Sequence, residues 1–175
     1  MKNIRIILTA GIVLFVAISA AHAVQIDWLD KKCLVIDAAF QVCKPDHKWD
    51  TQKTREDHRP IKWVYHEEGA NPIIWLRYDD AAGKTAHDYA KFVRKELESR
   101  GIVVKSVQNK VMNGRNVSLI TGVNSGTNLR YLVGVWRNQA KGFNLECSAS
   151  IDNFSEYEHH CLKAIDSVKV VSETR

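Results

Sequence analysis

Between residues 142 and 170 the spacing of the apolar positions changes from that of a strand to that of a helix. In the first part apolar residues alternate with polar ones, as in a β-strand that buries one face: Phe143, Leu145, Cys147, Ala149 and Ile151. In the second part the apolar residues share one helical stripe: Cys161, Ile165 and Val168. We therefore expect this strand and this helix to share a core, with Cys147 and Cys161 both pointing into it.

A second helix and a run of strands are predicted upstream. Thr85 and Asp88 have the spacing of a capping box, and an apolar stripe continues to Ser99, so residues 85–99 are predicted to be helical. Residues 102–151 then contain four strands separated by turns, and Asn113-Gly114 is a strong hairpin signal. Strands joined by such short turns predict an antiparallel meander.

The N-terminal half predicts two hairpins separated by a loop. Residues 34–42 give two short strands around a central turn. Residues 61–66 and 73–79 are strand-like and flank a segment rich in turn residues. Residues 44–60 are polar, contain two prolines and show no period, so they are predicted to form a long loop.

Several strands of the meander are apolar on both faces, and such a sheet needs cover on both sides. We expect the two helices to cover one face, and loops, the N-terminal hairpin or a partner to cover the other. The predicted fold class is α+β, an antiparallel β-sheet meander with N-terminal hairpins and two main helices packed on the sheet.

The N-terminus has the features of a signal peptide. A short basic segment precedes an apolar run at residues 6–20, and Ala21-His22-Ala23 places small residues at the −3 and −1 positions of a cleavage site. We expect residues 1–23 to be removed after Ala23, which leaves a single α+β domain at residues 24–175; the alternative is an uncleaved N-terminal anchor. No other stretch is apolar and long enough to span a membrane. The predicted location is periplasmic or secreted.

Charge does not indicate a nucleic-acid partner. The whole chain has a formal net charge of +5. Residues 24–175 contain 23 basic and 20 acidic residues, and the basic residues are interleaved with the acids. No run resembles a nucleic-acid footprint, and export argues against one.

All four cysteines lie outside the predicted signal peptide. An even number of cysteines in an exported chain favours disulfides over free thiols. We predict the pairs Cys33–Cys43 and Cys147–Cys161, because each pair is local and easily formed between the expected elements. A zinc site would need shorter cysteine spacing than the sequence has.

The order of elements resembles the PsbP/DcrB-like superfamily. The resemblance covers residues 34–170 and rests on a strand ending in FQVCKP before a Trp-containing loop, a helix opening TAHDYAKFV, the Asn-Gly hairpin, the meander, and a final strand and helix ending in IDSVKV. It implies a non-enzymatic binding or assembly module, with no shared catalytic motif to transfer. The chain lacks the lipidated cysteine of DcrB-type proteins.

No catalytic motif is complete. Gly83-Lys84-Thr85 lacks the earlier glycine of a phosphate-binding loop, and Ala70 stands where a metalloprotease signature needs its second histidine. A recognition surface is predicted beside the polar loop, although ordinary anchoring of that loop is an alternative: His47, Trp49, His58, Trp63 and Tyr65. A weak metal site within residues 44–66 is a further alternative.

The sequence thus favours an exported, non-enzymatic binding or assembly module of the bacterial envelope with a protein or small-ligand partner and no cofactor. The alternatives are an envelope hydrolase that uses loop carboxylates and histidines, and a weak metal-binding protein. A pocket of converging carboxylates and histidines would favour the hydrolase.

Overall fold

The computed structural model describes residues 32–36, 40–54, 61–66, 72–138 and 140–171. The predicted signal peptide and His58 lie outside these residues. The elements follow the order β1 (Cys33–Ile36), β2 (Phe40–Cys43), β3 (Trp49–Lys53), β4 (Ile61–Tyr65), β5 (Ile73–Asp80), α1 (Ala86–Ser99), β6 (Val103–Met112), β7 (Arg115–Asn124), β8 (Leu129–Asn138), β9 (Lys141–Ser150), α2 (Phe154–Asp166) and β10 (Lys169–Val170).

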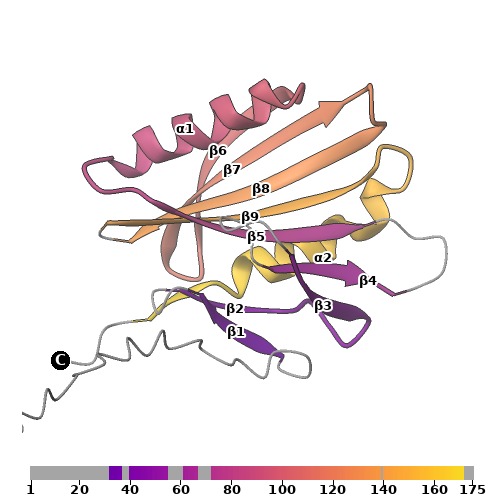
Figure 1. The fold of residues 1–175 in the computed structure, drawn as a ribbon, viewed down its shortest axis with the longest axis horizontal. Coiled ribbons are helices and arrows are strands. Elements are labelled where there is room, and N and C mark those ends of the chain that lie inside the picture. The colour runs from indigo at the N-terminus through magenta and orange to yellow at the C-terminus, as the bar shows by residue number, and fades with distance from the viewer. Residues whose placement is uncertain (1–31, 37–39, 55–60, 67–71, 139, 172–175) are drawn as a thin grey trace, which may run out of the picture.

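Seven strands form the main sheet and three form a smaller one. The main sheet has the order β3-β4-β5-β9-β8-β7-β6, and all its neighbours are antiparallel. Strands β6 to β9 are the predicted meander. The small sheet has the order β1-β2-β10, so the last strand joins the N-terminal hairpin (Figure 1). The α+β fold class predicted from the sequence is confirmed.

Local signals form as predicted at α1 and at the β6–β7 turn. Thr85 caps α1, and its hydroxyl accepts from the backbone N–H of Asp88 in a complete capping box. Asn113 and Gly114 have φ angles of 48° and 74°, the left-handed backbone that a tight hairpin turn requires. Both features depend only on residues close in sequence.

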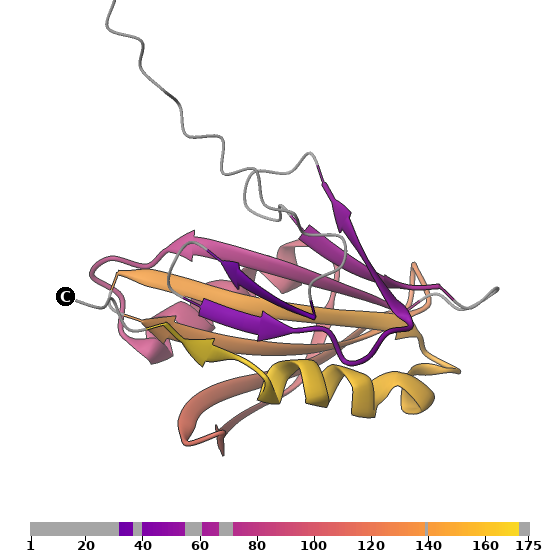
Figure 2. The ribbon, with the colours of Figure 1, turned by 90° about the horizontal axis from the view of Figure 1, so that it is seen from below.

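The two helices cover opposite faces of the main sheet, which corrects the expectation that they share one face. Buried residues of α1 pack with alternate residues of β8, Tyr131, Val133 and Val135. Buried residues of α2 pack on the other face, beside the small sheet (Figures 1 and 2). A sheet that is apolar on both sides is therefore covered within the chain, by one helix on each side.

Strand β9 is buried on both faces, whereas the sequence pattern predicted one wet face. Asn144 and Glu146 are each 2% exposed and Ser148 is 5% exposed, because α1 lies over them. Ile151, expected at the end of the apolar face, lies beyond the strand and is 37% exposed. The polar residues of β9 thus face a helix and must find partners there.

The segment predicted as a loop at 44–60 contains strand β3, so that prediction is wrong in part. β3 pairs with β4 along its whole length, and its inward residues are Trp49 and Thr51. The stretch WDTQK has only one large apolar residue, so alternation is difficult to recognise in the sequence. Its pairing with β4 supplies the order that its own residues do not.

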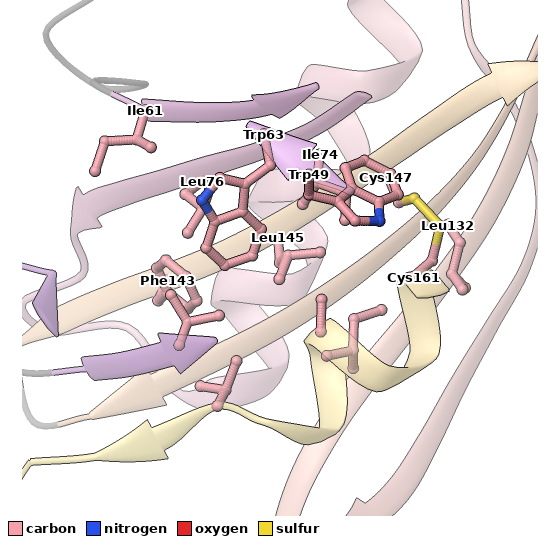
Figure 3. Packing of buried hydrophobic residues seen from close by; sticks show 14 of the residues in the cluster. Trp49, Ile61, Trp63, Ile74, Leu76, Leu132, Phe143, Leu145, Cys147 and Cys161 are labelled. Carbon is pink, nitrogen blue, oxygen red and sulfur yellow. A yellow bond between two sulfur atoms is a disulfide. The ribbon is translucent and has the colours of Figure 1, made fainter. Parts of the chain in front are cut away.

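Both cysteine pairs are joined in the structure. The Cys33–Cys43 disulfide closes the β1–β2 hairpin, with Cα atoms 3.9 Å apart. The Cys147–Cys161 disulfide joins β9 to α2, with Cα atoms 5.9 Å apart, inside the core (Figure 3). Among the described residues no helix is long and apolar enough to cross a membrane.

Candidate functional site

The residues predicted to form a recognition surface lie mostly in the core. Trp49 and Trp63 are both 0% exposed and pack beside Leu145 and the core disulfide (Figure 3). Tyr65 is 6% exposed, whereas His47 is exposed in the turn before β3. The two tryptophans therefore cannot line an exposed groove, because their side chains point to the face of β3 and β4 that packs inward.

The structure brings a histidine of α2 to this region instead. His160 lies 3.1 Å (Nδ1–Oδ2) from Asp46, and its ring contacts those of Trp49 and Tyr65. Burial, and then the neighbouring His159, lower the pKa of His160. Among the described residues no group of three His, Cys, Asp or Glu side chains could hold a metal ion.

Buried carboxylates gather under α1, but each is held by an arginine. Arg100 binds both oxygens of Glu146, at 2.7 and 2.5 Å, and also contacts Glu96. Glu96 also pairs with Arg77, which donates two bonds to Asp79. These charges form one continuous network of ion pairs between α1 and the sheet.

The ionisation of the groups in this ion-pair network follows from their geometry. Bonding to Glu146 raises the pKa of Arg100 despite its burial. Burial lowers the pKa of Arg77, but the hydrogen bond to Asp79 and the charges of Asp79 and Glu96 together outweigh it, so the net change is upwards. The pKa of Tyr89 is raised by burial and by its bond to Asp79. The arginines therefore stay charged and Tyr89 stays neutral, so these ion pairs hold α1 on the sheet.

A groove opens where β7 separates from β8. The ladder between them ends at the pair Ser118–Val135, so Val117 and Trp136 are not paired with each other. Both remain paired on their other sides, with β6 and β9. The closed end of the β6–β7 hairpin bends away from the end of β8 (Figures 1 and 2). A hollow of about 630 Å³ lies at this separation, and we call it the β7–β8 groove.

The β7–β8 groove combines apolar surface with two arginines that form no ion pair with a carboxylate of the described residues. Its apolar lining residues include the buried Val117 and Trp136 and the more accessible Ala86 and Val170. Arg115 Nη1 donates to the carbonyl oxygen of Val168 at 3.3 Å. Arg137 Nε is buried and has no hydrogen-bond partner among the described residues. None of the described residues that line the groove is Asp or Glu.

A smaller hollow of about 280 Å³ continues the groove between α1 and the β6–β7 hairpin. The two hollows share His87, Asn109 and Ser118, and the smaller one adds Lys91 and Arg94. Its described lining residues also include no acid. The cationic character therefore extends along α1.

The distribution of charge along the sequence agrees with a positively charged groove. Residues 84–141 contain 11 of the 25 Lys and Arg residues but only three of the 20 Asp and Glu residues. All three acids already have a partner: Asp88 caps α1, Glu96 binds arginines of the ion-pair network beneath α1, and Glu98 pairs with Arg94. The segment that forms the groove is therefore strongly positive.

Sequence reasoning missed Arg115 and Arg137 because it treated the basic residues as scattered. The imbalance within residues 84–141 was the available signal, since it does not depend on the fold. What the sequence could not indicate was that β7 and β8 separate at the level of these two arginines.

Solved structures share this fold at low sequence identity. The solution structure of cyanobacterial PsbP from Synechocystis sp. PCC 6803 has a TM-score of 0.60 and 12% identity, and the match covers 78% of this chain and 89% of that chain. The crystal structure of LpqN, involved in cell envelope biogenesis of Mycobacterium tuberculosis, has a TM-score of 0.55 and 13% identity, over 73% and 80%. The Saccharomyces cerevisiae Ran-binding protein Mog1p has a TM-score of 0.53 and 14% identity, over 82% and 97%.

No protein-family model and no curated protein matches the sequence. At identities of 12–14%, the structural matches concern the fold alone. The chain therefore has the PsbP/DcrB-like fold, as the order of its elements predicted.

Proposed function

We propose that this protein is an exported, non-catalytic module of the bacterial envelope that binds a small ligand in the β7–β8 groove. The observation that carries the proposal is the groove itself, which combines apolar lining with Arg115 and Arg137 and no acid among its described lining residues. Its volume of about 630 Å³ lies within the range of small-molecule sites, which is roughly 300–1,000 Å³.

The chemistry of the site favours binding over hydrolysis. A hydrolase needs a base or nucleophile beside its substrate. Here Asp79, Glu96 and Glu146 are bound to arginines beneath α1, and neither hollow is lined by a carboxylate among the described residues. A weak metal role at residues 44–66 has no comparable support, since the described histidines there do not converge.

Export to the envelope is supported by three observations of different kinds. The N-terminal 23 residues have the pattern of a signal peptide. Both cysteine pairs are bonded, which suits an oxidising compartment. One protein of the same fold, LpqN, is involved in cell envelope biogenesis.

Cell fractionation and the intact mass of the purified protein test this location. We expect the protein in the periplasmic or secreted fraction, with Val24 as its first residue. Recovery of the full 175-residue chain in the membrane fraction would instead support the uncleaved anchor.

Native mass spectrometry of the protein mixed with an extract of envelope small molecules tests binding and catalysis together. We expect a one-to-one complex whose released compound has the same mass as in the untreated extract. A released compound altered by the addition of water would indicate a hydrolase. The urea-unfolded, reduced chain is the control, and an equal signal there would show that adducts do not need the groove.

A further inference from the structure

Resting on the proposed function, we infer that the ligand of the β7–β8 groove is an amphiphile with a carboxylate or phosphate head and an apolar body. The head lies between Arg115 and Arg137, and the apolar body lies against the accessible apolar wall at Ala86 and Val170. The inference depends on where the strands separate, on the two arginines that line the hollow and on the charge around the groove.

The separated strands make this region suitable for an inserted group. Beyond the pair Ser118–Val135, the edges of β7 and β8 that face each other have no ladder partner. The separated strands therefore leave room for an inserted group beside the buried side chains of Val117 and Trp136, which are 1% and 4% exposed.

The arginines specify a negatively charged head. A guanidinium presents a planar set of N–H donors that fits a carboxylate or a phosphate with two parallel bonds. Arg137 has a buried Nε without a partner among the described residues, and a buried donor left in this state is unfavourable. Because the guanidinium of Arg137 is positively charged, an anion in the groove gains a charge-assisted hydrogen bond that a neutral head does not.

The surroundings add long-range attraction for an anion. Arg115 is the first residue of β7 and is held at the groove by its bond to the Val168 carbonyl. Arg137 lies at the end of β8, so both arginines come from ordered strands. The first turn of α1 lines the same hollow through Ala86 and His87, and helix N-termini favour negative charge. Lys91 continues the positive surface along α1, whereas Arg94 is paired with Glu98.

The apolar lining excludes a bare anion as the whole ligand. Inorganic phosphate would satisfy the guanidinium groups but would leave the accessible apolar part of the groove wall, at Ala86 and Val170, in contact with water. An apolar body covers this surface, and the free energy gained grows with the apolar area that leaves water. The head supplies specificity and the body supplies much of the affinity.

Isothermal titration calorimetry of the full chain, expressed with its own N-terminal segment, tests the inference. The probes are decanoate, decyl phosphate, decanol and inorganic phosphate, each below its aggregation concentration. We expect decanoate, decyl phosphate or both to bind, and decanol and inorganic phosphate to bind at least about tenfold more weakly. The ratio between decanoate and decyl phosphate identifies the head.

Variants locate the site. We expect R137Q to weaken binding of the anionic probe about 10- to 100-fold, and R137K to recover only part of it, because lysine lacks the paired donors. K105Q removes the same charge from the same segment at an exposed residue of β6 that lines neither hollow, and it should bind normally. The melting temperature of each variant shows that the fold is intact, and R115Q provides a second arginine variant if R137Q does not fold.

Three results would overturn the inference: decanol binding as tightly as decanoate, inorganic phosphate binding as tightly as decyl phosphate, or equal losses in R137Q and K105Q. Absence of binding by all four probes would overturn it as well. In each case a one-to-one complex with a compound from the envelope extract would leave the proposed binding function standing, so the two failures are distinguishable.

Discussion

Arg100, just after the last turn of α1, contacts both carboxylate oxygens of Glu146 in the middle of β9. The Nη1–Oε2 distance is 2.7 Å and the Nη2–Oε1 distance is 2.5 Å. The Glu146 side chain is 3% exposed and the Arg100 side chain 30% exposed. This pair lets a carboxylate lie beneath a helix, because two charge-assisted hydrogen bonds replace its water.

Replacing Arg100 with methionine should therefore lower the free energy of unfolding by about 2–4 kcal/mol. Removing one partner of a fully buried pair typically costs about 3–5 kcal/mol, and the partial exposure of Arg100 reduces that loss. Urea denaturation at pH 7 measures it. The control is R94M on the same helix, whose exposed pair with Glu98 should contribute about 0.5 kcal/mol or less. Equal losses in R100M and R94M would contradict a special role for the buried pair.

Replacing Tyr89 with phenylalanine should cost about 1.5–3 kcal/mol at pH 7, the usual range for a hydrogen bond to a charged group. The Tyr89 hydroxyl donates to Asp79 at 2.7 Å and accepts from Asn144 at 3.3 Å. Y131F is the control, since Tyr131 is buried but makes no hydrogen bond through its hydroxyl within the described residues.

The difference between the wild type and Y89F should also depend on pH in one direction. The pKa of Tyr89 is raised above its ordinary value of 10.0 by burial and by Asp79. The extra stability is therefore complete below pH 10 and is lost as pH rises from 10 towards the folded-state pKa, because only the unfolded chain ionises there. Urea denaturation at several pH values checks this. A difference that widens above pH 10 would refute the assignment.

Gly142 lies directly beneath the Tyr89 ring, and we expect G142A to destabilise the protein by about 1–3 kcal/mol, as overpacking usually does. A Cβ at this position would lie within 2.7 Å of three ring carbons. Thermal unfolding measures the loss, and G126A in an exposed turn is the matched control. Combining G142A with Y89L should restore part of the loss if the clash with the ring is its cause.

The Cys147–Cys161 disulfide should contribute about 3 kcal/mol, the value expected for a loop closed by cysteines with a sequence separation of 14. Replacing both cysteines with alanine and measuring urea denaturation tests this value. The Cys33/Cys43 double variant provides a comparison at a hairpin outside the main sheet. Free thiols at positions 147 and 161 after purification without reductant would contradict the pairing.

Predictions from local sequence succeeded where the physical cause was local. The capping box of α1 involves residues three positions apart, and the Asn113-Gly114 turn requires two adjacent residues with positive φ. The meander followed from such turns. The strand β3 was missed because WDTQK carries one large apolar residue, and its order comes from pairing with β4.

The candidate site was harder to predict than the fold. Trp49 and Trp63 were placed on a recognition surface because they flank a polar segment, but the structure buries both. Arg115 and Arg137 were not singled out because neither belongs to a motif. They meet at one groove only because the β7–β8 ladder ends beside them.

The sequence by itself determined the helices, the hairpins, the cysteine pairs and the positive charge of residues 84–141, because these depend on spacing, turn chemistry and composition. The tertiary structure alone decided which polar residues are buried and which cations share a groove. The sequence of an alternating strand such as β9 does not show what covers its polar face. In the structure α1 lies on that face, and Arg100 is opposite Glu146. The end of a ladder likewise depends on how two strands bend relative to each other, a property that neither strand encodes alone.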